Sequence, residues 1–193
     1  MTYMQCTEDP FLLRKVATEL EELRCHDLAT ANDIHVDGAP FPRACRKLLQ
    51  SIPGNSCCVD CGRRNPDWAS VSYGVLLCTN CSGKHRSYGV SISRVRSISM
   101  DSWSHSQVLA MLEGGNEQLQ KFFSRHEIKK ENSKVFDQRY QTKAARFYRK
   151  NMKQHVEKIE TIGEWMGREA SRKVVTRPTK LMQNTRPMAV AVQ

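Results

Sequence analysis

Four cysteines near the middle of the chain are spaced as ligands for one metal ion. They form two pairs, Cys58 with Cys61 and Cys78 with Cys81, and sixteen residues separate the pairs. Two residues inside each pair let both thiolates of a tight turn point at one ion, and a loop of this length brings the two turns together. Because four thiolates leave no open coordination position, the sequence predicts one structural Zn²⁺ that supports folding and not chemistry.

Two nearby residues are alternative ligands for this ion. Cys57 could replace Cys58 through a longer gap, although the two-residue spacing favours Cys58. His85 follows Cys81 by four residues, and with four sulfurs available we interpret it as a packing or hydrogen-bonding histidine. The four cysteines outside the pairs show no pairing pattern and are interpreted as free thiols: Cys6, Cys25, Cys45 and Cys57.

Length and charge limit the class of protein. A chain of 193 residues can close one hydrophobic core, and no apolar run is long enough to cross a bilayer. Since the first residues also lack a basic and apolar leader, we expect a protein of a reducing compartment that is not secreted. The net charge of +10 favours anionic partners, which are nucleic acid, acidic lipid or an acidic protein face.

Helical signals dominate the rest of the chain. Ser104 and Gln107 form a capping box, and the helix that they begin is expected to stop at Gly114. Asn116 is expected to cap the next helix. Apolar periodicity and capping residues predict helices over residues 10–25, 43–52, 105–113 and 117–125, a long helix from about residue 143, and a helical turn or two over 82–88. Alternating apolar residues predict short strands over 71–77 and 95–100.

The residues from Cys58 to Trp103 resemble the Arf GTPase-activating domain. This run reads CVDCGRRNPDWASVSYGVLLCTNCSGKHRSYGVSISRVRSISMDSW, and it is similar to the zinc finger of that family and its continuation almost position for position. Similarity continues through GGN at 114–116 and YQTKAARFYR at 140–149, so it covers roughly residues 42–158. The zinc spacing occurs in other fingers, but the arginine five residues after the last cysteine, together with PDWAS and VRS, is specific.

The resemblance implies a fold and an activity. The implied fold is α+β, with a small central antiparallel sheet that carries the four-cysteine zinc finger and has helices around it. The implied function is to stimulate GTP hydrolysis by a GTP-bound Arf-family GTPase, in vesicle traffic. Such a protein is no enzyme itself, because it contributes an arginine to the active site of the GTPase. The implied location is cytoplasmic, with peripheral recruitment to Golgi or endosomal membranes.

The resemblance also implies roles for single residues. Arg86 becomes the catalytic arginine, although its position alone would indicate a solvated surface arginine. Trp68 is either a core residue or a GTPase contact, and the resemblance favours contact. Met100 and Asp101 are further contact candidates whose alternative is a strand end and turn. We interpret Arg96 as structural, pairing with Asp101, whereas Arg63, Arg64 and Lys84 either enrich a positive face or are solvated.

The similarity has limits along the chain. We divide the chain into an extension at 1–40 with a helix and linker, a zinc-finger domain at 41–168, and a disordered tail at 169–193. This tail has no acid after Glu169, so we expect it to add affinity for anionic membranes. Ser91 stands where the family usually has histidine, which leaves the arginine chemistry intact but changes local packing.

Two other functions compete with this interpretation. A GATA-like zinc finger that reads DNA also uses two such cysteine pairs, and the chain is basic. A DNA reader should continue from the last pair into a basic helix and tail, whereas this segment is broken by Gly89 and continues into several helices. We therefore do not expect nucleic acid as a partner. An adaptor that keeps the fold without activity is the second alternative, and the presence of Arg86 argues against it.

Overall fold

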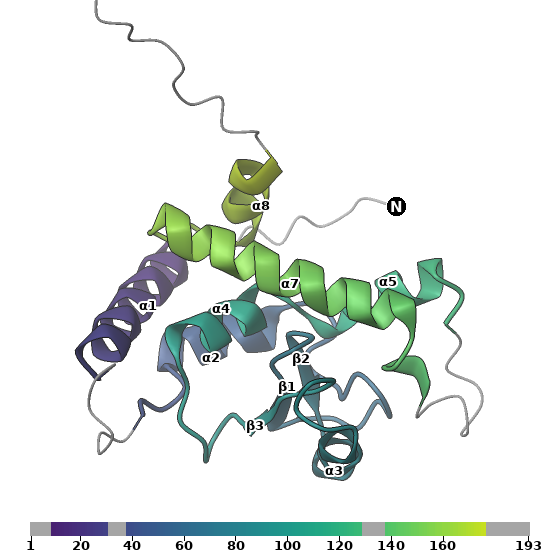
Figure 1. Ribbon diagram of the computed structural model, residues 1–193. Coiled ribbons are helices and arrows are strands. Elements are labelled where there is room, and N and C mark those ends of the chain that lie inside the picture. The colour runs from purple at the N-terminus through teal and green to yellow at the C-terminus, as the bar shows by residue number, and fades with distance from the viewer. Residues whose placement is uncertain (1–8, 31–37, 129–137, 177–193) are drawn as a thin grey trace, which may run out of the picture.

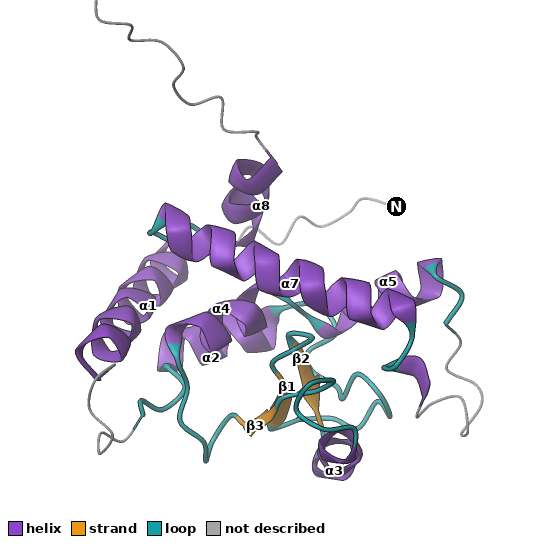
Figure 2. Cartoon of the chain, viewed as in Figure 1, coloured by secondary structure: helices purple, strands orange, loops and turns teal. Residues whose placement is uncertain are grey.

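A sheet of three short strands lies on one side of the molecule, and helix α7 runs across the other side (Figure 1). The computed structural model describes residues 9–30, 38–128 and 138–176. Helices account for most of this part (Figure 2), and they are α1 (Pro10–Thr30), α2 (Arg43–Ser51), α3 (Thr79–Ser87), α4 (His105–Glu113), α5 (Asn116–Arg125), α7 (Lys143–Ile162) and α8 (Arg168–Thr176). None of the described helices is both long and apolar enough to cross a membrane.

The sheet confirms the α+β class. Its strands are β1 (Trp68–Ser70), β2 (Val75–Leu77) and β3 (Val95–Ser97), and the central β1 pairs antiparallel with both neighbours. The prediction of one strand over 71–77 was wrong in its first half. Residues 71–74 form the turn between β1 and β2, and Gly74 adopts a positive φ of 62° there. The apolar alternation arises because the turn residues Val71 and Tyr73 are themselves buried.

Of the predicted helix ends, those of α4 agree with the structure and the N-cap of α5 does not. The capping box of Ser104 and Gln107 is present, and α4 ends before Gly114 as expected. The expected cap at Asn116 was wrong, because Gly115 occupies that position and Asn116 is the first residue of α5. The Asn116 side chain instead accepts a hydrogen bond from the Leu76 N–H at 2.7 Å and donates to the Cys57 carbonyl at 2.6 Å. It therefore connects the sheet to the turn that carries the cysteines.

Helix α1 is attached to the fold by an apolar stripe and by two carboxylates. Its Val16, Leu20 and Leu23 are buried in the common core. Glu19 accepts hydrogen bonds from the Ala44 and Cys45 N–H groups at the start of α2, and Asp27 accepts from His105 N–H at the start of α4. One helix thus satisfies free N–H groups at the beginning of two others, which is the role of an N-cap.

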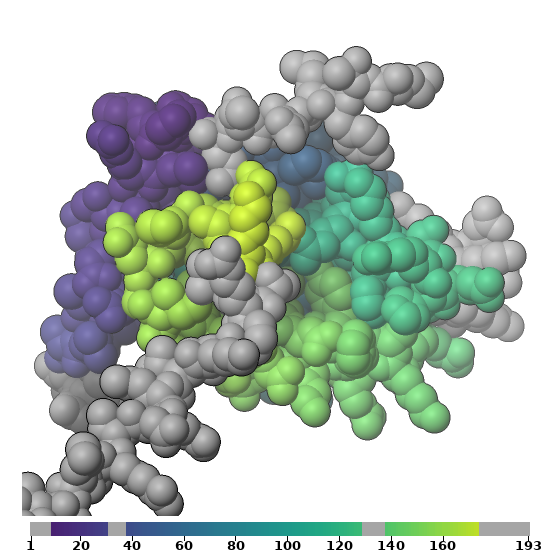
Figure 3. Space-filling model, turned by 90° about the horizontal axis from the view of Figure 1, so that it is seen from above, coloured from purple at the N-terminus to yellow at the C-terminus, as the bar shows by residue number. Residues whose placement is uncertain are grey.

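The C-terminal helices meet at the buried side chain of Glu113, the last residue of α4. Its Oε2 lies 2.8 Å from His155 Nε2. Its Oε1 lies 2.7 Å from Trp165 Nε1 and 2.8 Å from Ser171 Oγ. Residues 168–176 form helix α8, so the packed part of the chain extends past the boundary that we drew at 168. Seen from above, α7 and α8 cover the surface between α1 and α5 (Figure 3). The tail from residue 177 lies outside the described residues.

Two glycines let the sheet and the helices touch through their backbones. The Gly115 N–H donates to the Gly74 carbonyl at 2.7 Å. A Cβ atom added to Gly74 would lie 2.8 Å from the Gly114 Cα, and one added to Gly114 would lie 2.6 Å from the Gly74 Cα. The β1–β2 turn and the end of α4 can therefore approach this closely only without side chains.

Candidate functional site

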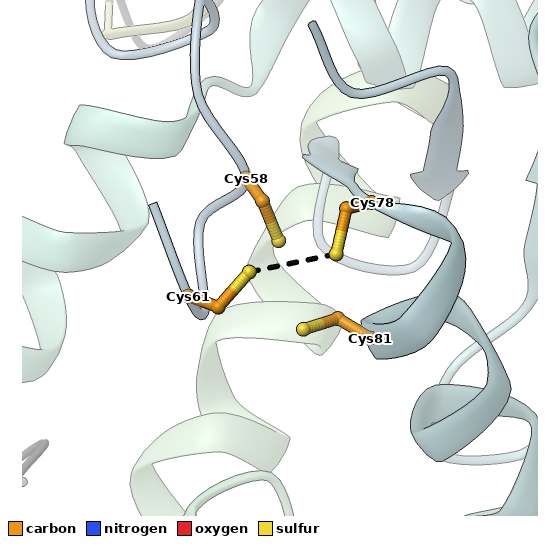
Figure 4. Close-up of side chains that lie close together, drawn as sticks. All are labelled: Cys58, Cys61, Cys78 and Cys81. Carbon is orange, nitrogen blue, oxygen red and sulfur yellow. Dashed lines mark hydrogen bonds between the residues drawn. The ribbon is translucent and has the colours of Figure 1, made fainter. Parts of the chain in front are cut away.

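The four paired cysteines converge at one edge of the sheet. Their Sγ atoms all lie within 4.8 Å of one another, and those of Cys61 and Cys78 are 3.5 Å apart. Figure 4 shows the four side chains pointing toward a common centre, the first pair from a turn and the second from the start of α3. The first turn closes through Gly62, whose positive φ of 76° places its N–H 2.9 Å from the Cys58 carbonyl.

This cluster has the donors and spacing of a metal site. A tetrahedral centre with Zn–S bonds of about 2.3 Å places its sulfurs about 3.8 Å apart. Burial raises the pKa of Cys58 to about 11 and also raises the pKa of Cys81. At Cys78 the effect of burial is outweighed by hydrogen bonds from the Cys81 backbone and the neighbouring thiols, and the pKa falls to about 7. Four thiolates this close repel one another, so a bound cation would stabilise the group.

The two alternative ligands lie outside the cluster. Cys57 forms an isolated antiparallel bridge with Arg64, and its sulfur lies 3.8 Å from Ser56 Oγ. His85 is fully buried and hydrogen-bonded to Asp60 and Ser93 through its two ring nitrogens. The structure therefore places Cys58 in the cluster in preference to Cys57 and gives His85 partners other than a metal.

Arg86 and Trp68 lie against each other. Arg86 is exposed in the last turn of α3, and its guanidinium carbon is 4.3 Å from the centre of the Trp68 ring. Trp68 is half-buried at the first position of β1, which packs against α3. Cys78 is the N-cap of this helix, Cys81 lies in its first turn, and His85 is buried. The exposed arginine therefore extends from a short helix that is fixed at several points.

The remaining contact candidates lie in the turn after β3. Met100 is 71% exposed, whereas the Asp101 carboxylate accepts a hydrogen bond from the Ser97 N–H at 2.7 Å. Arg96 donates to the Ser102 carbonyl, and within the described residues it forms no ion pair with Asp101. Asp101 thus holds the turn that presents Met100, and the pairing of Arg96 that we expected is replaced by a backbone contact.

A chain of buried polar groups connects the first cysteine turn to α3. Asp60 lies between Cys58 and Cys61, and its Oδ2 is 3.0 Å from Nε2 of His85. The other ring nitrogen of His85 is 2.7 Å from Ser93 Oγ, which lies 2.6 Å from Ser70 Oγ in the sheet. This network of polar groups therefore connects the first cysteine turn, the helix of Arg86 and the central strand.

Asp60 is ionised within this network of buried polar groups. Burial acts to raise the pKa of Asp60, but the hydrogen bond from His85, the charge of Arg139 and the Tyr140 hydroxyl outweigh it and hold the pKa below its ordinary value. Because an ionised carboxylate only accepts, His85 Nε2 carries the hydrogen, and in the neutral ring Nδ1 accepts from Ser93. Tyr140 donates to the second Asp60 oxygen at 2.6 Å, and Arg139 also contacts it.

This order of serine, histidine and aspartate is also that of a hydrolytic triad, but burial excludes such a role here. Asp60 is 4% exposed, His85 0% and Ser93 1%, so no substrate can reach the hydroxyl. These buried hydrogen bonds hold α3 in position. Sequence reasoning missed this network, and the one local signal was an acidic residue, Asp60, inside the first cysteine pair.

Comparisons with known proteins agree with this geometry. The family model of ArfGap, "Putative GTPase activating protein for Arf", matches residues 43–159. The chain is 45% identical over 108 residues to ADP-ribosylation factor GTPase-activating protein 3 of Mus musculus, which covers 55% of this chain and 20% of the mouse protein. It is 46% identical over 89 residues to ADP-ribosylation factor GTPase-activating protein GCS1 of Saccharomyces cerevisiae, covering 45% of this chain and 25% of the yeast protein.

Solved structures give the same answer. The crystal structure of a "putative GTPase activating protein for ADP ribosylation factor" from Cryptosporidium parvum aligns with a TM-score of 0.53 at 31% identity, over 58% of this chain and 88% of that one. The curated relatives are much longer, and the matched part spans a fifth to a quarter of their length. Since the family model covers more than half of the 193 residues, this chain belongs to the ArfGap family.

Proposed function

We propose that this chain stimulates GTP hydrolysis by an Arf-type GTPase and that Arg86 enters the active site of the GTPase. One observation carries the proposal. Arg86 is an exposed arginine on the nine-residue helix α3, which has the clustered Cys78 as its N-cap, the clustered Cys81 in its first turn, and a buried His85. A cation that is fixed in place but exposed can enter a partner's site with little ordering of its own backbone.

The chemistry needs an arginine of this kind. Hydrolysis of GTP spreads negative charge over the oxygens of the transferring phosphoryl group, and a trans-acting arginine raises the rate by about 10³ to 10⁵. A guanidinium stays charged and offers several fixed donors, whereas lysine provides one flexible point charge. The contact of Arg86 with the Trp68 ring is worth only about 0.5–1 kcal/mol at an exposed site. Leaving it is therefore a small cost beside the roughly 4–7 kcal/mol that this rate factor represents.

We assign Zn²⁺ to the four-cysteine cluster, with Cys58, Cys61, Cys78 and Cys81 as ligands. When bound, the ion supplies folding energy and no reaction step, because four thiolates fill its coordination sphere. The second pair brackets the first turn of α3, so the ion would fix the start of the helix that carries Arg86. Its effect on hydrolysis is therefore indirect.

Three further residues form the proposed contact surface for the GTPase: Trp68, Met100 and Asp101. Trp68 and Met100 offer apolar area beside Arg86 and in the next turn, and Asp101 holds that turn in shape. We further propose that the protein acts in the cytoplasm as a peripheral protein of Golgi or endosomal membranes. The positive charge of the chain favours such anionic surfaces.

The deciding experiment is single-turnover hydrolysis of GTP by myristoylated Arf proteins with wild-type chain, Arg86→Ala and Arg86→Lys. We expect Arg86→Ala to bind the GTPase but to lose about 10³ to 10⁵ in stimulated rate, and Arg86→Lys to recover little of it. Arg125→Ala is the matched control, because Arg125 is also an exposed arginine in the last turn of a helix. Its stimulated rate should equal that of the wild type.

The same assay separates the competing functions. Full stimulation by Arg86→Ala would contradict the proposal, and no stimulation by the wild-type chain would favour an adaptor that binds without activating. Trp68→Ala should weaken binding to the GTPase. It should lower the hydrolysis rate less when this protein is present at a saturating concentration, as expected for a contact residue. The DNA-reading alternative predicts DNA binding with a steep salt dependence, and family membership gives it no support.

A further inference from the structure

A groove of about 670 Å³ lies between α7, α4 and the loop that follows α3. Its floor includes the buried side chains of Val71, Met152 and Val156. Arg94 lines it from the loop, and further basic residues line it from α7. The volume lies within the range of small-ligand sites in proteins, which is about 300–1,000 Å³.

The charges along this groove do not balance. Five cationic side chains line it, and they are Arg94, Arg146, Arg149, Lys150 and Lys153. Only two carboxylates of the described chain line it: Glu157, which lies 3.7 Å from Lys153, and Glu160, which lies 3.4 Å from His105. Within the described residues, no carboxylate lies within 4.0 Å of the other four cations. The groove therefore carries excess positive charge that nothing in the described chain neutralises.

Arg149 is the most informative of these residues. It is half-buried, and one of its terminal nitrogens is fixed by the Tyr73 hydroxyl and by the Tyr140 carbonyl at 2.9 Å. Both partners are neutral. The Tyr140 partner is a backbone carbonyl, and burial raises the pKa of Tyr73 to about 12, which keeps its hydroxyl protonated. The buried Arg139, by contrast, contacts the carboxylate of Asp60. A partly desolvated guanidinium without an anion is unfavourable, so Arg149 is oriented for an anion that comes from outside the chain.

We propose that this groove binds a compact anion with several phosphate groups, held by Arg149 at its base and by Arg94, Arg146 and Lys150 at its rim. Arginine forks match phosphate oxygens in pairs, and several cations from two segments of the chain suit a ligand with more than one phosphate. The spacing on α7 supports one shared ligand, because residues 146, 149, 150 and 153 fall on one helix face. The source is either a phosphoinositide headgroup or a free inositol polyphosphate.

The site is separate from the proposed catalytic arginine. Neither Arg86 nor Trp68 lines the groove. Binding can therefore be measured without any GTPase, and failure of the groove proposal would leave the proposed activation of GTP hydrolysis untouched. The tail from residue 177 also carries positive charge, so the variants must distinguish a shaped groove from general basicity.

The test uses the whole chain and two double variants of α7 that lose equal charge. Arg146→Gln with Lys150→Gln removes two groove cations, and Lys143→Gln with Lys158→Gln removes two exposed cations that do not line the groove. Calorimetric titration with inositol hexakisphosphate should give about tenfold weaker binding for the groove pair and about wild-type binding for the control pair. Arg94→Gln, in the loop that lines the groove, should also weaken binding severalfold.

Vesicles identify the source of the phosphate. Sedimentation compares vesicles containing phosphatidylinositol 4,5-bisphosphate with phosphatidylserine vesicles of equal surface charge. A lipid source predicts preference for the phosphoinositide, with loss in the groove pair, whereas a free source predicts binding of inositol hexakisphosphate and no such preference. The proposal is overturned if the wild type binds neither probe, if both double variants lose affinity equally, or if Arg94→Gln binds as wild type. Thermal unfolding checks that every variant is folded.

Discussion

Two buried carboxylates, Asp60 and Glu113, organise the two sides of this molecule in different ways. Asp60 collects His85, Arg139 and Tyr140 beside the cysteine cluster, where no strand is longer than three residues. Glu113 joins the long helices and binds side chains from beyond residue 159, where the family match ends. The sheet side therefore depends on specific polar contacts and, as we propose, on a metal. The helical side depends on apolar burial, with Glu113 attaching the last helices to it.

The difference matters for function because the two sides need different properties. The exposed cation of Arg86 must be held accurately, and directional hydrogen bonds to the neighbouring His85 provide this accuracy. The helices α1 and α8 only need to stay attached to the core, which α1 achieves through its buried stripe, Glu19 and Asp27, and α8 through the contact of Ser171 with Glu113. We expect changes on the sheet side to alter both stability and rate, and changes on the helical side to alter stability alone.

Loss of a cysteine ligand is the largest expected effect and tests the dependence of the sheet side on metal. Cys58→Ser should leave the domain unfolded, because structural zinc sites contribute about 10 kcal/mol or more to folding. Circular dichroism and metal analysis measure this, and the wild type should hold one zinc per chain. Cys57→Ser is the control, since its sulfur is outside the cluster and one zinc should remain. A folded wild-type chain without metal would contradict the assignment.

Removing the carboxylate on the helical side should have the next largest effect. Glu113→Ala leaves the Trp165 N–H unpaired in the core and removes one of the two acceptors of the Ser171 hydroxyl, so we expect a loss of about 3–5 kcal/mol in unfolding free energy. Chemical denaturation measures this loss. Glu117→Ala, which removes a surface pair with Lys121, should cost less than about 1 kcal/mol. The comparison fails if both variants unfold at the same denaturant concentration.

His85→Asn sharpens the comparison because it should change rate as well as stability. Breaking the contacts to Asp60 and Ser93 should cost about 1–3 kcal/mol in unfolding free energy. Arg86 would then be placed less accurately. This should lower the stimulated rate, measured at a saturating concentration of this protein, more than it weakens GTPase binding. His126→Asn replaces an exposed histidine and should leave both unchanged. An unaltered rate in a destabilised His85→Asn would assign this chain of contacts to stability alone.

The smallest effect is expected at the contact between α1 and α2. Glu19→Gln weakens the acceptor for the Ala44 and Cys45 N–H groups, at a cost of about 0.5–2 kcal/mol in thermal unfolding free energy. The stimulated rate should stay at the wild-type value. Glu22→Gln is the control on the same helix, because Glu22 is exposed. Equal melting temperatures for Glu19→Gln and the wild type would contradict the capping role of Glu19.

Local signals were sufficient for much of this architecture. The capping box at Ser104, the apolar stripe of α7 and the two cysteine pairs each depend on residues within a few positions of one another. The structure confirms the helices that these patterns predict. The strand over 71–77 was misplaced because burial of a tight turn produces the same alternation as a half-buried strand.

Contacts between distant residues could not be predicted in this way. Asp27 reaches His105 across 78 positions, and Tyr140 reaches Asp60 across 80. Nothing in the sequence near Asp27 or Glu19 distinguishes a residue that caps another helix from a solvated charge. The expected cap at Asn116 was wrong for the same reason, since its amide is used by Leu76, 40 positions earlier.

The backbone contact between Gly74 and Gly114 restricts how this family member can change over evolution. Each glycine faces main-chain atoms of the other, so a side chain gained at one cannot be accommodated by a smaller side chain elsewhere. Ordinary core positions drift by compensated exchange of volume between neighbours, and this pair has no volume to exchange. Both positions are therefore expected to stay glycine in descendants of this chain, while the helices around them diverge freely.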